Sequence, residues 1–383
     1  MDGDLIEATV EKLVPGGEGL ARVDGQAVFV PGGLPGERIR APVADRRRRW
    51  MRTGSPRILE ASDDRREAFC PLFGECGGCL WQHLEYSAQL RAKESFVREA
   101  LARQGGIPEE DQPAIRTVAS RPRNYRCRIR PRIRSDGRPG FRASGSHRVV
   151  PIPHCPIAVD AVNDFFADPR MEPGGPTEPV VFGQGRRHWV SGRDDEARAE
   201  LGGRTFRFPP DAFFQSNLDP LEDLVDFVLS GIDPDERRLA LDLYGGVGLF
   251  GSYLADRFDA VIGVERDRRA REAWIRHVGI RGTFHTSSLE AWATGAAAVR
   301  PDFIVVDPPR SGLSPPVRGT LKSLAARNLA YVSCDPVTQA RDLHDLGSGG
   351  YRIAALGLFD LYPQTPHVET VALLRWDAPE RST

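Results

Sequence analysis

Reactive side chains lie at the ends of apolar segments in the second half of the chain. Cys334 follows NLAYVS, Asp307 follows DFIVV, and Glu369 precedes TVALLRW. Ligands of open α/β sheets bind beyond the carboxyl ends of parallel strands, so Cys334 and Asp307 are expected at one edge. An ionised thiol there is a nucleophile, and a partly buried carboxylate is a general base. Taken singly, such a cysteine is more often a core residue, and such a glutamate is more often solvated.

A glycine loop supplies a second element of this edge. The segment LDLYGGVGLFG runs from an apolar strand into a helix, with Gly246 inside the loop, and Glu265 ends the next predicted strand. Glycines let a ligand approach the backbone, and a carboxylate at the second strand end can bind ribose hydroxyls. The pattern fits NAD or S-adenosylmethionine, and GGVG departs from the G-x-G-x-x-G of dinucleotide sites.

Cysteines form a separate cluster near residue 75. Cys70, Cys76 and Cys79 are closely spaced, Gly77-Gly78 lies between the last two, and Cys155 follows far downstream. Four thiolates can hold a [4Fe–4S] cluster or zinc, and the spacing alone leaves both open. Cys127 lies on the apolar side of an alternating segment, which predicts a packing role.

Positive charge is concentrated in two stretches, although the net charge is −1. Residues 38–66 carry ten Arg and four acids, and residues 121–148 carry ten Arg and one acid. Local potential attracts a polyanion, so RNA is one expectation, and two solvated faces are the alternative. Within Tyr125–Arg134 the alternation predicts a strand with five arginines on one face.

The elements that must position these residues suggest three domains. Short alternating runs with Gly and Pro turns predict a small β-barrel over residues 1–60. A mixed α+β region with the metal site is expected over 61–210, and alternating strands and helices predict a parallel, doubly wound domain over 211–383. No run approaches the roughly 20 apolar residues of a membrane span, and the N-terminus does not look like a signal peptide, so a cytoplasmic protein is expected.

Together the motifs resemble the RNA uridine-C5 methyltransferase family, over nearly the whole chain. The N-terminal run VEKLVPGGEGLARVDGQAVFVPGGLPGERI is similar to a TRAM domain, an OB-like barrel. CPLFGECGGCLWQH with HCP resembles the [4Fe–4S] site of the iron–sulfur members. FFQSN, DLYGGVG, VE, DPPR, SCDP and PHVE resemble the signatures of a Rossmann-like class I methyltransferase domain.

This resemblance implies a role for individual residues. Cys334 would be the nucleophile that attacks uracil C6, and Glu369 the base that removes the C5 proton. The residues implied to contact S-adenosylmethionine are Gln215, Tyr244, Gly246, Glu265 and Asp307, and those implied to hold the cluster are Cys70, Cys76, Cys79 and Cys155. Leu249 and Ser287-Ser288 depart from the family pattern at the positions expected near adenine.

The implied partner is RNA, with ribosomal RNA favoured over tRNA. No membrane partner is expected, and the oligomeric state stays open, with a monomer expected. One rival is a methyltransferase acting on an exocyclic amine, which typically has an aromatic residue where Arg310 stands. The other is a non-catalytic iron–sulfur protein that binds RNA, against which the complete set of motifs argues.

Overall fold

The computed structural model describes residues 4–169 and 175–377. These residues divide into two compact units. The first contains Met1–Phe96, Phe141–Val150 and Tyr362–His367, and the second contains Val97–Gly140, Pro151–Leu361 and Val368–Thr383. This division does not coincide with the boundaries proposed at residues 60 and 210, which stay predictions.

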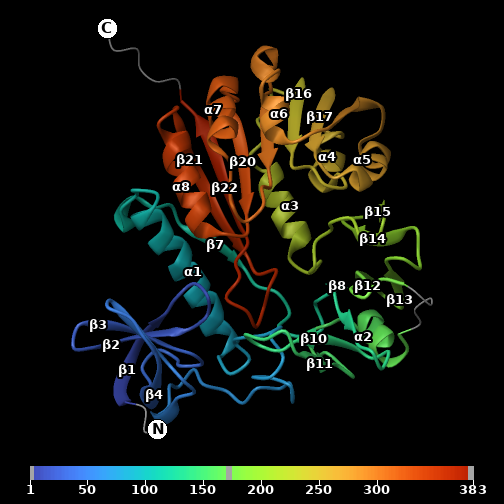
Figure 1. Ribbon diagram of the computed structural model, residues 1–383. Helices are drawn as coiled ribbons and strands as arrows, with labels where there is room; N and C mark the ends of the chain where they lie inside the picture. Colours follow the sequence, from blue (N-terminus) through green and yellow to red (C-terminus); the bar gives the residue numbers. More distant parts are fainter. Residues whose placement is uncertain (1–3, 170–174, 378–383) are drawn as a thin grey trace. The chain divides into compact units, whose positions relative to one another are not determined.

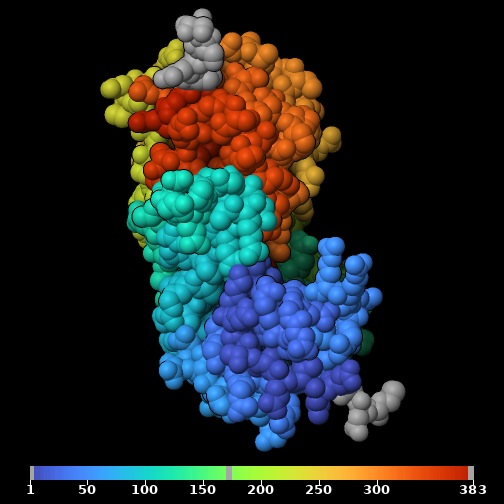
Figure 2. All heavy atoms as spheres, turned by 90° about the vertical axis from the view of Figure 1, so that its left-hand side faces the viewer, coloured from blue at the N-terminus to red at the C-terminus, as the bar shows by residue number. Residues whose placement is uncertain are grey.

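The N-terminal strands form a closed barrel in the first unit. The six strands are β1 (Leu5–Leu13), β2 (Gly19–Val23), β3 (Gln26–Val30), β4 (Arg38–Arg46), β5 (Trp50–Thr53) and β6 (Arg57–Glu60). They pair in the order β1-β2-β3-β5-β4-β6, and an additional β1–β4 pairing closes the barrel. Alternate residues such as Val10, Val28 and Ile39 fill its interior. The outer surface of these strands is blue in Figure 2, and the strand pairing confirms the predicted barrel.

Many arginines of the barrel are paired with acids. Arg38 and Arg40 both bind Glu7, and Arg52 binds Glu18 at 2.7 Å. The acids come from β1 and the β1–β2 turn, outside the basic stretch of the sequence. The excess positive charge predicted for residues 38–66 is therefore partly neutralised in the fold.

Helix α1 (Tyr86–Arg103) follows the cysteine segment. Within the first unit, Phe96 of this helix packs with Trp81, whose indole Nε1 donates to the carbonyl of Gly17 at 2.9 Å. The helix ends just before Gly105, as its sequence predicts. Gln89 of the same helix donates to Gln364 Oε1 at 3.0 Å, so the segment Tyr362–His367 is packed onto this unit.

The arginine-rich segment does not form the single strand predicted for it. Two short strands, β8 (Arg128–Ile129) and β9 (Arg132–Ile133), replace it, because Pro131 between them cannot donate to a ladder. The predicted alternation of burial holds at Tyr125, Cys127 and Ile129, which are each 2% exposed. The facing arginines are largely engaged in the fold: Arg132 binds Glu178 and Arg134 binds Asp136.

The rest of this region consists of short elements. They are η1 (Glu109–Asp111), β10 (Pro139–Arg142), β11 (Val149–Pro151), α2 (Asp160–Ala167), β12 (Val181–Gln184), β13 (Arg187–Val190), β14 (Ala197–Leu201) and β15 (Arg204–Phe208). They form the sheets β11-β10-β9 and β13-β12-β8 and the hairpin β14-β15. Buried Phe182, Phe208 and Phe214 stack edge-on or face-on in the second unit and tie β12 and β15 together.

An eight-stranded sheet dominates the second unit (Figure 1). Its order is β18-β17-β16-β19-β20-β22-β21-β7. The strands are β7 (Ile115–Val118), β16 (Leu239–Leu243), β17 (Ala260–Glu265), β18 (Gly282–Thr286), β19 (Phe303–Val306), β20 (Asn328–Ser333), β21 (Tyr351–Phe359) and β22 (Thr370–Trp376). Five neighbouring strands, β18, β17, β16, β19 and β20, are parallel to one another. Strand β22 runs antiparallel to β20 and β21.

Helices cover both faces of this sheet, which confirms the predicted doubly wound α/β architecture. One face carries α3 (Leu221–Leu229), α4 (Leu249–Leu254) and α5 (Arg271–Val278), and the other carries α6 (Leu289–Ala293), α7 (Pro315–Leu324) and α8 (Pro336–Gly347). Short 3-10 turns are η2 (Arg268–Ala270), η3 (Gly279–Arg281) and η4 (Ala296–Ala298). Among the described residues, no helix is long and apolar enough to span a bilayer.

Candidate active site

The glycine loop leaves the sheet at its topological switch point. Strand β16 pairs with β17 on one side and with β19 on the other, so the chain beyond Leu243 opens into the crevice where such folds bind ligands. The Gly246 N–H donates to Glu265 Oε2 at 3.3 Å, and the Asp267 N–H donates to Oε1 at 2.8 Å. The carboxylate predicted to meet ribose is thus fixed beside the loop.

Tyr244 turns the chain out of β16. Its φ of +59° lies in the left-handed region, where a non-glycine residue is strained. Gly246 (φ +49°) and Gly248 (φ +91°) continue the turn without such strain. Burial raises the pKa of the Tyr244 phenol to about 12, so the side chain keeps its O–H as a donor.

Asp307 lies at the end of the neighbouring strand. Its N–H donates to the carbonyl of Leu243 at 3.2 Å, which brings the Asp-Pro-Pro turn beside the glycine loop. Burial raises the pKa of Asp307 to about 7, and the charges of Asp242 and Glu265 add to the effect. This carboxyl group therefore lacks a positive partner strong enough to compensate for its burial.

Strand register brings Cys334 and Glu369 together. Ser333 of β20 pairs with Thr370 of β22 in an antiparallel ladder, so the residues just beyond them, Cys334 and Glu369, flank the same end of the two strands. Asp335 then caps α8 by accepting hydrogen bonds from the Val337 and Thr338 N–H groups. The register thus places both residues at one edge of the sheet, and their roles as nucleophile and base stay predictions.

The electrostatics of this pair are unusual. Burial first, and then the charges of Glu369 and Asp307, raise the pKa of the Cys334 thiol to about 11. Arg310 acts in the opposite direction, through its charge and a hydrogen bond to the thiol. Glu369 is 3% exposed, and burial together with Asp307 raises its pKa well above that of an ordinary glutamate. Without ligands, the edge holds a protonated thiol and carboxyl groups that are hard to ionise.

Gln215 is 6% exposed and enters from the loop before α3. Its carbonyl accepts a contact from the Cys127 thiol at 3.5 Å, and the Cys127 N–H donates to the Ser216 carbonyl at 2.8 Å. Cys127 is 2% exposed with a pKa raised to about 12 by burial. The packing role predicted for Cys127 is confirmed, and the contact also fixes the backbone of Gln215.

Two residues at this edge are not predicted from the sequence. In the sequence, Arg310 is only a departure from the aromatic residue that is typical of exocyclic-amine methyltransferases. In the structure, Arg310 is the cation that faces the Cys334 thiol. Asp242 is 1% exposed. The sequence feature that could have identified it is a lone carboxylate inside the otherwise apolar strand LALDL. Such a buried carboxylate requires donors.

The region expected near adenine has a defined local structure. Ser288 caps α6 by accepting a hydrogen bond from the Ala291 N–H at 3.2 Å, and Ser287 Oγ donates to the Ser288 carbonyl at 3.0 Å. Leu249 is 8% exposed at the start of α4. The hydroxyls of Ser287 and Ser288 thus make hydrogen bonds within the chain.

The metal site is not assembled in the described residues. Cys70, Cys76 and Cys79 lie in the first unit and Cys155 in the second. Across residues 4–169 and 175–377, no group of three or more His, Cys, Asp or Glu side chains is arranged to hold a metal ion. The donor chemistry suits an iron–sulfur cluster or zinc, but the geometry of the site is not confirmed.

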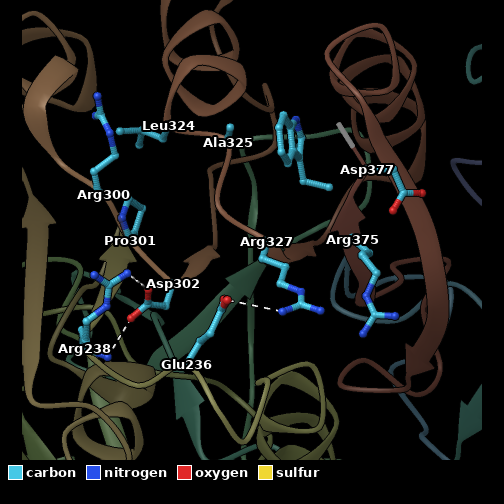
Figure 3. Close-up of a pocket in the computed structure, with 11 residues that line it drawn as sticks. Glu236, Arg238, Arg300, Pro301, Asp302, Leu324, Ala325, Arg327, Arg375 and Asp377 are labelled. Carbon is cyan, nitrogen blue, oxygen red and sulfur yellow. Dashed lines mark hydrogen bonds and ion pairs between the residues drawn. The ribbon is translucent and has the colours of Figure 1, made fainter. Parts of the chain in front are cut away.

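A hollow of about 610 Å³ lies at the other end of the large sheet (Figure 3). It is lined by residues at the amino ends of β16, β19 and β20, including Arg238, Asp302 and Arg327. Ion pairs span it, at 2.9 Å between Arg238 and Asp302 and at 3.3 Å between Arg327 and Glu236. None of the predicted site residues lines this hollow.

Comparison with known proteins identifies the families and relatives that this chain resembles. Residues 298–376 match the family model described as tRNA (Uracil-5-)-methyltransferase, and residues 1–49 match the TRAM domain. An uncharacterized RNA methyltransferase of Streptomyces coelicolor is 34% identical, with 97% of this chain and 93% of the relative covered. The 23S rRNA (uracil(1939)-C(5))-methyltransferase RlmD of Pseudomonas aeruginosa is 32% identical, with 95% and 93% covered.

A solved structure extends the similarity to the fold. The tRNA (uracil-54, C5)-methyltransferase of Pyrococcus abyssi, in complex with S-adenosyl-L-homocysteine, has a TM-score of 0.72 and 25% identity. The match covers 96% of this chain and 100% of that structure. Similarity over the full length, together with the site geometry, shows that the chain belongs to the S-adenosylmethionine-dependent RNA (uracil-C5)-methyltransferase family.

Proposed function

We propose that this enzyme methylates C5 of a uridine in 23S ribosomal RNA, with Cys334 as nucleophile and Glu369 as base. The observation that carries the assignment of roles is the β20–β22 register, which pairs Ser333 with Thr370 and so sets the thiol beside the buried carboxyl group. The RlmD relative supports ribosomal RNA as the substrate class. The tRNA named for the Pyrococcus abyssi structure is the alternative substrate.

The proposed reaction uses each residue for a defined step. The Cys334 thiolate adds to C6 of the uracil, and the electron pair of the C5–C6 double bond moves into an enolate that makes C5 nucleophilic. S-adenosylmethionine supplies the methyl group to C5. Glu369 then takes the C5 proton, the C–H electron pair restores the double bond, and the Cys334 thiolate leaves.

The charges at this edge suit a cationic methyl donor. Asp307 and Glu369 have raised pKa values, mainly because of burial. A sulfonium and an ammonium group brought into the crevice would favour the ionised form of both carboxyl groups. Tyr244, Gly246, Glu265, Asp307 and Gln215 are the residues we assign to holding the donor. Arg310 favours the Cys334 thiolate that attacks the ring.

Residues suited to binding RNA are found both near Gln215 and in the barrel. Phe213 is 55% exposed two residues before Gln215, and the Arg128 guanidinium lies 5.7 Å from its ring centroid. An exposed ring beside a cation is suited to stack an unpaired base. In the first unit, exposed Arg48 and Arg49 lie in the turn between β4 and β5, where they can contact phosphates.

The mechanism is tested with RNA that contains 5-fluorouridine. Fluorine at C5 cannot leave as a proton, so the wild type should form an adduct that survives denaturation, and Cys334→Ala should form none. Cys127→Ala, which removes a buried thiol, is the matched control and should keep the adduct. An adduct in Cys334→Ala would contradict the assignment of the nucleophile.

The substrate class is tested in a deletion strain of the source organism. Mass spectrometry of separated 23S ribosomal RNA and tRNA should show loss of one 5-methyluridine from the ribosomal RNA only. Loss confined to tRNA would overturn the ribosomal assignment while leaving the chemistry intact.

The cysteines form a separate part of the proposal, in which Cys70, Cys76, Cys79 and Cys155 bind a [4Fe–4S] cluster. Its support is the spacing of the four thiols, with Gly77-Gly78 between Cys76 and Cys79, where glycines let backbone N–H groups approach the sulfur atoms. Protein purified without oxygen should be brown and contain iron and sulfide, and Cys76→Ser should lose both. A colourless protein with stoichiometric zinc would refute the cluster.

A further inference from the structure

A buried pair of side chains supports the glycine loop from behind. Trp274 of α5 is fully buried, and Asp242 of β16 is 1% exposed. The indole Nε1 donates to Asp242 Oδ2 at 2.8 Å, and the Gly251 N–H donates to the same oxygen at 3.1 Å. Because Gly251 lies in the helix that begins directly after the loop, one carboxylate oxygen links α5, β16 and α4.

The sequence provides the space that this indole needs. A Cβ at Gly263 of β17 would lie 2.3 Å from Trp274 Cε2, and a Cβ at Gly282 of β18 would lie 2.7 Å from Cζ3. At Gly248 of the loop itself, a Cβ would lie 3.1 Å from the indole Cδ1. The indole ring is therefore packed between β17, β18 and the loop, and this packing fixes the direction of its N–H.

Helix α5 holds the loop at a second point. One turn after Trp274, the His277 Nδ1 lies 2.7 Å from the Val247 carbonyl, and Nε2 accepts from the Arg207 N–H at 2.9 Å. These partners require a neutral ring with its proton on Nδ1. Burial lowers the pKa of His277, which agrees with that form.

We infer that Trp274 is a positioning residue for the methyl donor, acting through Asp242 and Gly251 to keep the glycine loop in its binding conformation. It touches none of the residues assigned to the reaction, so its effect should fall on cofactor affinity and spare the chemical step. A buried carboxylate that loses one of its two donors is no longer held in one orientation, and this weakens the support that its contact gives to the Gly251 N–H.

The ionisation of Asp242 agrees with this geometry. Burial raises its pKa to about 6, and the N–H groups of Trp274 and Gly251 act against that rise. Two carboxyl groups face Asp242. The charge of Glu265 raises the pKa of Asp242, and the charge of Asp242 raises the pKa of Asp307. Removing the indole donor should thus favour the protonated form of Asp242 near neutral pH.

The test is Trp274→Phe, which keeps an aromatic ring and removes the N–H. Affinity for S-adenosyl-L-homocysteine, measured by calorimetry without RNA, should fall about tenfold, as expected for one lost hydrogen bond to a buried charged group. The KM for S-adenosylmethionine should rise by a similar factor, and kcat at saturation should stay within about twofold of the wild-type value. Equal affinity in the variant and the wild type, or a loss confined to kcat, would overturn the inference.

Trp376→Phe is the matched control. Its Nε1 donates to the Gly349 carbonyl at 3.0 Å at the opposite end of the sheet, so it also removes one indole hydrogen bond. It should leave the affinity unchanged. Hydrogen exchange of peptides that cover Gly245–Gly251 should speed up in Trp274→Phe and not in Trp376→Phe. Exchange that is unchanged in both would contradict a role in holding the loop.

A second pair of variants keeps the inference testable if Trp274→Phe does not fold. Asp242→Asn preserves an oxygen acceptor and should retain the affinity within about threefold, whereas Asp242→Leu, of similar size, should lose at least tenfold. Similar affinities in these two variants would show that the carboxylate does not support the loop. Because the affinity measurements use cofactor binding alone, they stand even if the proposed roles of Cys334 and Glu369 are wrong.

Discussion

The two ends of the large sheet differ in how their charges are compensated. At the amino end, Arg238 and Asp302 form an ion pair at 2.9 Å, and Arg327 binds Glu236 beside a hollow of about 610 Å³. At the carboxyl end, Asp307 is partly buried and Glu369 is buried, and the pKa of each carboxyl group is raised. The end with the hollow is thus electrostatically satisfied, and the end at which we propose the active site is not.

This difference shows which observation identifies a functional site. Paired surface charges stabilise a fold slightly and leave pKa values ordinary, whereas uncompensated buried carboxyl groups cost free energy that a ligand can recover. A cationic methyl donor is the ligand that the carboxyl end lacks. The predictions below probe the two ends, starting with the largest expected effect.

Glu369→Gln should lower turnover by about a hundredfold or more, the usual range for loss of a general base. With the proton retained on C5, methylated RNA should remain attached to Cys334, so an adduct with ordinary uridine should accumulate on denaturing gels. Glu236→Gln at the amino end is the control and should turn over normally. Fast turnover without an accumulated adduct would remove Glu369 from the mechanism.

Asp307 should make cofactor binding depend on pH. Its pKa of about 7 in the free protein means that it is largely protonated at pH 6. A bound cation favours the ionised form, so binding releases a proton, and affinity should increase with pH by up to about tenfold per unit until about pH 7. Calorimetry with S-adenosylmethionine between pH 5.5 and 7.5 should show this slope in the wild type and a shallower slope in Asp307→Asn, in which Glu369 still responds to the cation.

Arg310→Leu should make the Cys334 thiol less reactive. Burial raises the pKa of the Cys334 thiol to about 11 even though Arg310 lowers it. Removing Arg310 should therefore raise the pKa of this thiol further. Alkylation by iodoacetamide at pH 9 should slow by about tenfold for each unit of that rise. Arg310→Lys should keep part of the effect, and an unchanged rate in Arg310→Leu would show that the guanidinium does not act on the thiol.

Arg327→Ala at the amino end should have the smallest effect. Its side chain is 52% exposed, so loss of its ion pairs with Asp233 and Glu236 should lower the free energy of unfolding by less than about 1 kcal/mol. Methyl transfer should be unchanged. A large loss of activity would mean that the two ends are coupled and that the contrast drawn between them fails.

The sequence and the structure agree best where local pattern decides the outcome. The alternating N-terminal runs form the predicted barrel because period-two burial needs no distant partner to be recognised. The segment Tyr125–Arg134 shows the limit. Its alternation of burial is correct, but Pro131 divides it into two strands, and Arg132 pairs with the distant Glu178, which no local pattern predicts.

By itself, the sequence determined the reactive residue types, their order and their places at strand ends: Cys334, Asp307, Glu369 and the glycine loop. It could do so because apolar strands and glycine turns are local signals. Only the tertiary structure decided that Arg310 faces the thiol and that Trp274 supports the loop through Asp242. Those relations depend on strand register and burial, which bring together residues tens of positions apart and set their charges against one another.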